Sequence, residues 1–272
     1  MDLARLYDNR AAVPEHPSII AGWARDAAGF RASHPVELDQ VYGARPRNRF
    51  DVIQAPGGAA RPLIVFIHGG YWRSLEKSSF THMAAGPLAH GFSVAIPGYT
   101  LCPEVTLPDI IDEMRQCCLH LWRQYGRPLI VVGHSAGGHL AASMAATDWT
   151  QFGQPRDMVR AVFPVSGIFD LRPLLATPIN ADLRLSPEQA VIASPLLWPV
   201  NHRFAAAIWA GSIETAEFRR QSATLAAAWS GLGLDVTWYE VEGADHFSIA
   251  AELSSPHSPM TQSLVSLAGA LA

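Results

Sequence analysis

The stretch 129-LIVVGHSAGG-138 contains the pattern that decides the fold. Leu129–Val132 is a short apolar run, and residues 133–137 (GHSAG) match the pattern G-x-S-x-G. The Ala-rich segment Gly138–Ala146 follows and is predicted to be a helix. A serine between glycines at a sharp strand-to-helix turn projects its hydroxyl beyond the end of the sheet. This context predicts a reactive Ser135 at the carboxyl end of a buried strand.

The same succession of apolar run, glycine-rich turn and helix recurs along the chain. The other apolar runs are Leu63–Ile67, Phe92–Ile96, Val159–Val165, Phe204–Ala210 and Val236–Val241. A further helix is predicted at Leu107–Tyr125. Near-continuous apolar strands that alternate with helices are typical of a parallel sheet covered on both faces. We therefore predict the α/β class, with a mostly parallel central sheet and functional groups just beyond the carboxyl ends of its strands.

Two segments interrupt this pattern. Residues 1 to about 45 precede the first clear strand, and a helix that contains Trp23 is predicted within Pro14–Ala32. The segment Leu171–Arg203 carries five prolines, and prolines disrupt sheets and long helices. We predict one domain over residues 1–272, with an N-terminal arm at about 1–45 and a small cap of short helices at about 171–203. The cap is expected to be either an active-site lid or a plain surface excursion.

Composition and charge narrow the class of protein. The 272 residues include 20 Lys and Arg against 24 Asp and Glu, and the basic residues are scattered, so no nucleic-acid partner is expected. We see no secretory signal and no apolar run of about 18 residues, so no membrane association is expected. Cys102, Cys117 and Cys118 suggest no disulfide framework and favour a reducing compartment. The chain is predicted to be cytoplasmic, to act on a small molecule, and to use neither metal nor cofactor.

Position along the chain selects the partners of Ser135. A serine hydroxyl is a weak nucleophile unless a base removes its proton. His246, in the EGADHF sequence at 242–247, follows the last clear strand and lies downstream of Ser135, as the order serine, acid, histidine requires. Glu214 follows the turn after Phe204–Ala210 and is the predicted acid. The competing carboxylates are Glu217, Asp245 and Asp170.

Two turns are predicted to supply the oxyanion hole. One donor is the backbone N–H of Ala136, the residue after the nucleophile. The other donors are the N–H groups of Gly70 and Tyr71 in the HGGYW sequence at 68–72, where Gly69 gives room for a close approach of the backbone. His68 is expected to have a structural role.

These motifs together resemble the kynurenine formamidase (arylformamidase) branch of the α/β-hydrolases, a neighbour of the hormone-sensitive-lipase-like esterases. The matching stretches are HGGYW at 68–72, GHSAGGHLAA at 133–142, SGIFDLRPL at 166–174, SPEQAVIASPLL at 186–197, GSIETAEFRRQS at 211–222 and DHF at 245–247. The resemblance implies an α/β-hydrolase fold with Ser135 as nucleophile, His246 as base and Glu214 as acid. The family usually has Asp at the acid position, so Glu214 is a departure. The resemblance also implies a homodimer.

The resemblance leaves two activities open, because both use the same triad. One is hydrolysis of N-formylkynurenine to formate and kynurenine, and the other is cleavage of small acyl esters, as in a carboxylesterase. Hydrolysis of other amides or carbamates is a further alternative, as is a non-catalytic binding protein on this fold. An aromatic leaving group requires a slot of aromatic and aliphatic side chains. The candidates for this slot are Trp72, Phe169, Leu197, Trp198 and Phe247, beside Tyr71.

Overall fold

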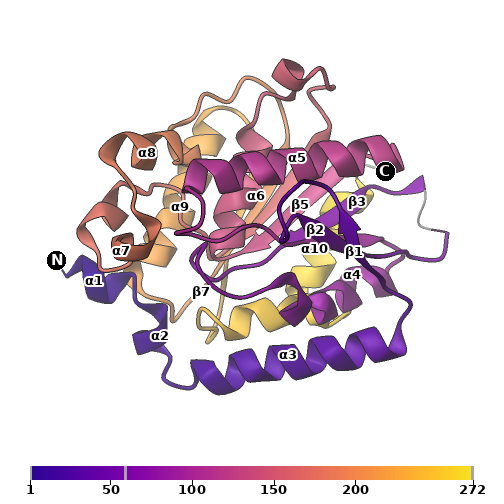
Figure 1. Cartoon of the computed structure of the whole chain (residues 1–272), viewed down its shortest axis with the longest axis horizontal. Coiled ribbons are helices and arrows are strands. Elements are labelled where there is room, and N and C mark those ends of the chain that lie inside the picture. The colour runs from indigo at the N-terminus through magenta and orange to yellow at the C-terminus, as the bar shows by residue number, and fades with distance from the viewer. Residues whose placement is uncertain (1, 58–59, 271–272) are drawn as a thin grey trace.

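An eight-stranded, mostly parallel sheet forms the centre of the computed structural model, which describes residues 2–57 and 60–270 (Figure 1). The strand order is β1-β2-β4-β3-β5-β6-β7-β8. Strands β3 to β8 run parallel to one another, whereas β1 and β2 are antiparallel additions at one edge. The predicted fold class is confirmed. The strands are β1 (Glu37–Val41), β2 (Arg49–Ile53), β3 (Leu63–Ile67), β4 (Val94–Pro97), β5 (Leu129–His134), β6 (Val159–Val165), β7 (Ala205–Gly211) and β8 (Asp235–Val241).

Helices cover both faces of the sheet. Figure 1 shows α5 and α6 on one side of the sheet and α3 and α10 on the other. The α-helices are α1 (Leu3–Leu6), α2 (Asn9–Ala12), α3 (His16–Ser33), α4 (Ala85–Ala89), α5 (Leu107–Tyr125), α6 (Ala136–Ala146), α7 (Asn180–Leu183), α8 (Pro187–Ile192), α9 (Ala216–Gly231) and α10 (Pro259–Gly269). The 3₁₀ helices are η2 (Lys77–Ser79), η3 (Thr81–Ala84), η4 (Trp149–Phe152), η5 (Arg172–Ala176), η6 (Pro195–Leu197) and η7 (Ser248–Ser254).

Successive residues of the central strands point to opposite faces and enter two different cores. In β5, Leu129 and Val131 pack in the core that includes α5 and α6. Ile130 and Val132 pack in the core that includes α3 and α10. Because both faces are covered, every residue of β3 and β5 is buried, which explains why these strands are unbroken apolar runs in the sequence.

Local signals set the ends of α5, the helix predicted at Leu107–Tyr125. Thr106 and Asp109 form a capping box in which each side chain accepts a hydrogen bond from the backbone N–H of the other residue. Gly126 ends the helix in the left-handed conformation, with φ of 61°. These signals explain why this helix has the bounds that the sequence predicted.

The structure adds an antiparallel edge that the sequence did not predict. Strand β1 lies inside the N-terminal segment, and most of its residues are exposed. An edge strand with little core contact needs no apolar run, so the sequence pattern does not reveal it. The segment Leu171–Arg203 contains only short helices, η5, α7, α8 and η6, the longest of which has six residues.

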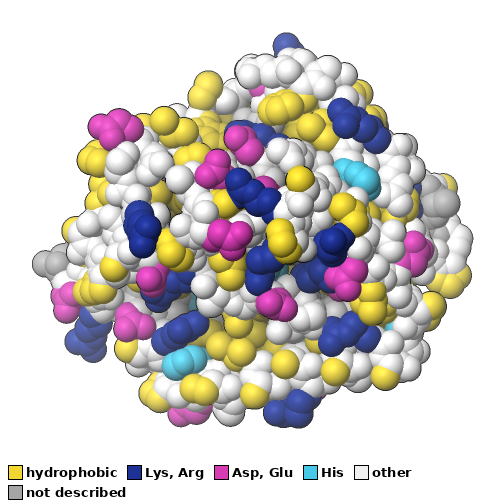
Figure 2. Space-filling view, viewed as in Figure 1, with side chains coloured by type: hydrophobic (Ala, Val, Ile, Leu, Met, Phe, Trp, Pro, Cys, Tyr) yellow, Lys and Arg dark blue, Asp and Glu magenta, His cyan; other side chains and the backbone are white. Residues whose placement is uncertain are grey.

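The surface carries charges of both signs. Figure 2 shows Lys and Arg side chains interspersed with Asp and Glu over the visible face, without a broad field of one sign. None of the helices within residues 2–57 and 60–270 is long and apolar enough to cross a bilayer.

Candidate active site

Ser135 lies between β5 and α6 in a strained backbone conformation. Its φ and ψ are 57° and −121°, which residues other than glycine rarely adopt. A Cβ at Gly133 would lie 2.0 Å from the carbonyl oxygen of Gly137, and a Cβ at Gly137 would lie 2.0 Å from that of Ile67. Glycine is therefore required on both sides of Ser135 for the turn to be this tight.

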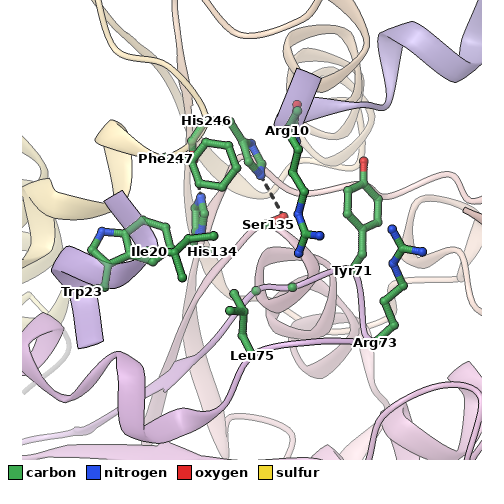
Figure 3. A pocket seen from close by; sticks show the side chains of 13 residues that line it. Arg10, Ile20, Trp23, Tyr71, Arg73, Leu75, His134, Ser135, His246 and Phe247 are labelled. Atoms are coloured by element: carbon green, nitrogen blue, oxygen red, sulfur yellow. Dashed lines mark hydrogen bonds between the residues drawn. The ribbon is translucent and has the colours of Figure 1, made fainter. Parts of the chain in front are cut away.

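A chain of hydrogen bonds joins Ser135, His246 and Glu214. Ser135 Oγ lies 2.9 Å from His246 Nε2, and His246 Nδ1 lies 2.7 Å from Glu214 Oε2. The dashed line in Figure 3 marks the bond between Ser135 and His246. All three side chains are buried. The structure thus brings together, from the ends of β5, β7 and β8, the three residues that the sequence suggested as a triad.

Glu214 is held by two further hydrogen bonds. Its Oε1 accepts from the backbone N–H of Gly211 at 2.7 Å and from Ser166 Oγ at 2.5 Å. Ser166 follows β6 and has a φ of 52°. Because these two donors occupy Oε1, the other carboxylate oxygen is directed to His246. Sequence reasoning missed Ser166, whose only signal is its position just after a buried strand.

The competing carboxylates are engaged elsewhere. Glu217 forms a two-pronged ion pair with Arg220 and accepts a hydrogen bond from the Tyr7 hydroxyl. The bond from Arg220 lowers the pKa of Glu217. Asp245 accepts from backbone N–H groups of its own turn, and Asp170 pairs with the arginine two residues further on. None of the three has a hydrogen bond to His246 in the part of the chain described.

The HGGYW loop lies against the nucleophile turn. A Cβ at Gly69 would be 3.0 Å from Ser135 Cβ, so the loop approaches the serine closely. Gly70 and Tyr71 have φ values of 110° and 51°. Among the described residues, no acceptor is found for the backbone N–H groups of Gly70, Tyr71 and Ala136. Ala136 also begins α6, whose N-terminal dipole favours negative charge nearby. Donors suited to an oxyanion are therefore available on both turns.

Two buried histidines hold the backbone of the site. His134 Nε2 donates to the carbonyl oxygen of His246 at 2.8 Å, and His68 Nδ1 donates to that of Gly69 at 2.7 Å. Burial lowers the pKa of His134 to about 3 and that of His68 to about 3, so both rings are neutral. Each ring therefore acts as a fixed hydrogen-bond donor and not as a proton carrier.

A pocket opens beside Ser135, and the N-terminal segment supplies much of its wall. Figure 3 shows Ile20 and Trp23 of α3 on one side of Ser135, with Arg10 and Tyr71 on the other. The lining residues are Asn9, Arg10, Ile20, Trp23, Gly69, Gly70, Tyr71, Arg73, Leu75, His134, Ser135, His246 and Phe247. Sequence reasoning missed the wall from the N-terminal segment because those residues belong to no motif and lie far from the serine in the chain.

Of the five residues suggested for an aromatic slot, the structure brings only Phe247 to this pocket. Trp72 and Phe169 are fully buried, and Trp72 packs edge-on against His139. Tyr71 and Trp72 both have left-handed backbones, which turn Tyr71 to the pocket and Trp72 into the core. Leu197 and Trp198 lie at the end of η6.

Neither Leu197 nor Trp198 lines the pocket that contains Ser135. In the segment that carries them, η6 packs against α6 and α8 packs against α5. Leu197 is 41% exposed. Trp198 donates to the carbonyl oxygen of Ile192 and lies under the guanidinium of Arg115.

In the described part of the chain, no group of three His, Cys, Asp or Glu side chains could hold a metal ion.

Comparisons with known proteins identify the family. Residues 51–206 match the BD-FAE family. Kynurenine formamidases from Danio rerio and Salmo salar are 31% and 32% identical over 85% of this chain and 82% of each relative. The crystal structure of a candidate thioesterase from Silicibacter sp. TM1040 has a TM-score of 0.88 and 32% identity, over 99% of both chains. The chain therefore belongs to the kynurenine formamidase branch of the α/β-hydrolases, and it is a serine hydrolase of the esterase and arylformamidase class.

Proposed function

We propose that the protein is an arylformamidase that hydrolyses N-formylkynurenine to formate and kynurenine, with Ser135, His246 and Glu214 as its triad. The observation that carries the proposal is the continuous hydrogen-bonded chain from Ser135 through His246 to Glu214 at the floor of a pocket with an aromatic wall. The similarity to two kynurenine formamidases over most of the chain supports the choice of substrate.

Acylation begins at Ser135 Oγ. As the oxygen attacks the formyl carbon, its proton moves to His246 Nε2, and the carbonyl oxygen becomes an oxyanion. The N–H groups of Gly70, Tyr71 and Ala136 stabilise this oxyanion because they are fixed before the reaction starts. Glu214 keeps the other imidazole proton on Nδ1, which leaves Nε2 free to accept the proton from serine.

The tetrahedral intermediate then breaks its C–N bond. His246 gives its proton to the arylamine nitrogen, kynurenine leaves, and Ser135 retains a formyl ester. A water molecule gives a proton to Nε2 and attacks this ester. His246 returns that proton to Ser135, and formic acid leaves and ionises to formate in solvent. The sum is one amide and one water converted to one acid and one amine.

The walls of the pocket suit a small acyl group and an aromatic leaving group. The close approach of Gly69 to Ser135 favours a formyl group, which bears only hydrogen on its carbonyl carbon. Trp23 and Phe247 lie with ring centroids 6.0 Å apart at 34°, and both line the pocket. An aryl ring beside them would gain dispersion and burial of apolar area.

Cleavage of small acyl esters or thioesters is the second candidate. The same triad performs it, and the likeness to the Silicibacter candidate thioesterase over 99% of both chains favours it. The experiment that separates the two is a comparison of kcat/KM on N-formylkynurenine and on p-nitrophenyl acetate. A hundredfold preference for the formamide would support the proposal. A hundredfold preference for the ester would show that the protein is an esterase and that the proposal is wrong.

We further propose that the enzyme acts in the cytoplasm as a homodimer. Its three cysteines are buried free thiols, which suits a reducing compartment. The dimer rests on the resemblance to the family. Sedimentation equilibrium of the full chain gives the mass of the assembly directly, and a monomer mass over the micromolar range would exclude the dimer.

A further inference from the structure

The pocket beside Ser135 contains a buried amide that lacks a protein partner. Asn9, the first residue of α2, is 3% exposed and lines the pocket that holds Ser135 and His246. Within the described residues, neither Oδ1 nor Nδ2 of Asn9 has a hydrogen bond. A buried amide without partners is uncommon and requires an explanation. Because the Asn9 amide lines the pocket, a polar group of a bound ligand could supply the missing hydrogen-bond partners.

Arg10 brings a positive charge to the same pocket. Figure 3 shows its side chain extending from α2 toward Ser135 and Tyr71. Its hydrogen bond to Ser74 Oγ is long, at 3.4 Å, and no described carboxylate forms an ion pair with it. Arg73, which also lines the pocket, is instead paired with Asp182. Arg10 therefore has guanidinium donors available for an anion.

The pocket is polar at one end and apolar at the other. Asn9 and Arg10 also line a second pocket, whose wall includes Arg5 and Ile179. They therefore border both the space around Ser135 and this second pocket. The apolar and aromatic part of the first pocket's wall is made by Ile20, Trp23, Leu75 and Phe247. This arrangement matches a molecule with an aromatic ring at one end and a charged polar tail at the other.

We propose that Asn9 and Arg10 form a subsite for the amino-acid tail of the substrate. Arg10 binds the α-carboxylate, because the guanidinium fork matches a carboxylate in two hydrogen bonds. Asn9 accepts from the α-ammonium group through Oδ1 and donates to the carboxylate through Nδ2. The inference rests on the proposed function and adds to it the groups that select aryl formamides carrying an amino acid over neutral ones.

Binding measurements test the subsite independently of turnover. Isothermal titration calorimetry on the full chain would compare kynurenine with 2-aminoacetophenone, which has the same aryl ketone without the amino-acid tail. We expect kynurenine to bind about tenfold more tightly, as for one hydrogen-bonded charged group that is partly exposed to solvent. In Arg10→Met this preference should fall to about twofold or less, and Arg10→Lys should retain part of it. Equal affinities in the wild type would overturn the subsite.

The control is Arg25→Met, which removes an exposed arginine of α3 that is outside the pocket lining. It should keep the full preference for kynurenine. If Arg10→Met weakened both ligands by the same factor, Arg10 would be structural and the proposal wrong. Absence of N-formylkynurenine hydrolysis with an intact tail preference would reject the proposed function alone. Hydrolysis without a tail preference would reject the subsite alone.

Asn9→Leu separates recognition from folding. Leucine has a similar size and removes a buried amide without partners, so the melting temperature should hold or rise. The dissociation constant of kynurenine should increase, while that of 2-aminoacetophenone changes much less. If the variant instead melted at a lower temperature and kept the ratio of the two dissociation constants, Asn9 would serve the fold and not the ligand.

Discussion

Replacing Glu214 by glutamine tests the acid of the triad, the position at which the family usually has Asp. Glu214 Oε1 accepts from two donors, the Gly211 N–H and the Ser166 hydroxyl, and Oε2 accepts from His246 Nδ1. In Glu214→Gln the amide oxygen should therefore stay with the two donors, and the NH₂ group should face His246. Nδ1 would then have to accept a hydrogen bond, which moves the ring proton to Nε2. In that tautomer His246 cannot take the proton from Ser135.

The expected result is a fall in kcat of about 1,000- to 10,000-fold with little change in KM, since the wrong tautomer affects the transition state and not ground-state binding. This corresponds to about 4–5.5 kcal/mol of lost transition-state stabilisation. Steady-state hydrolysis of N-formylkynurenine and p-nitrophenyl acetate would measure it, and circular dichroism would confirm the fold.

Glu217→Gln is the matched control, because Glu217 lies one helical turn away and is paired with Arg220 instead of His246. It should lower kcat by no more than about threefold, because the buried Glu217 carboxylate is bound by Arg220 and Tyr7 and has no hydrogen bond to the described atoms of His246. A larger loss in Glu217→Gln than in Glu214→Gln would move the acid to Glu217. A loss below tenfold in Glu214→Gln would show that the tautomer argument is wrong.

Three further changes test the support of Glu214, a buried histidine of the core and the aromatic wall of the pocket. Ser166→Ala removes one donor to Glu214 and should lower kcat about tenfold; an unchanged kcat would show that Gly211 alone holds the acid. Burial lowers the pKa of His139 to about 4 from 6.5, so the unfolded chain takes up this proton first and stability is lost as pH falls from 6.5 toward 4. The free energy of unfolding should fall by about 2 kcal/mol between pH 6.5 and 5 through this group. In His139→Gln, measured by urea unfolding, the fall should be smaller by that amount. The same fall in the variant and in the wild type would show that the pKa of His139 is not lowered in the folded protein. Trp23→Leu should raise KM for N-formylkynurenine more than KM for ethyl acetate, and equal increases would remove Trp23 from the aryl wall.

The three residues that the sequence predicted as a triad lie at the carboxyl ends of buried parallel strands. Ser135, Glu214 and His246 follow β5, β7 and β8, and the geometry of a parallel sheet brings those ends together. The glycines around Ser135 also allowed the tight turn to be predicted, because such a strand-to-helix turn permits few other residues. At these positions the local turn geometry and the overall fold require the same residues, so the sequence pattern was sufficient to predict them.

The walls of the pocket could not be predicted, because long-range packing sets them. Arg10 and Trp23 precede the first clear strand and belong to no motif, yet tertiary contacts place them beside Ser135. Trp72 is one residue from Tyr71, but two successive left-handed residues turn it into the core. Sequence spacing shows that aromatic residues are near the site without showing which way their side chains point.

Labelling with a fluorophosphonate tests the central claim most directly, because the reagent reacts only with a serine whose hydroxyl is activated by a base. Peptide mass spectrometry should find one adduct, on Ser135, with a parallel loss of hydrolysis. The adduct should be absent in Ser135→Ala and strongly reduced in His246→Ala. An adduct on a different serine, or undiminished hydrolysis by Ser135→Ala, would contradict the account.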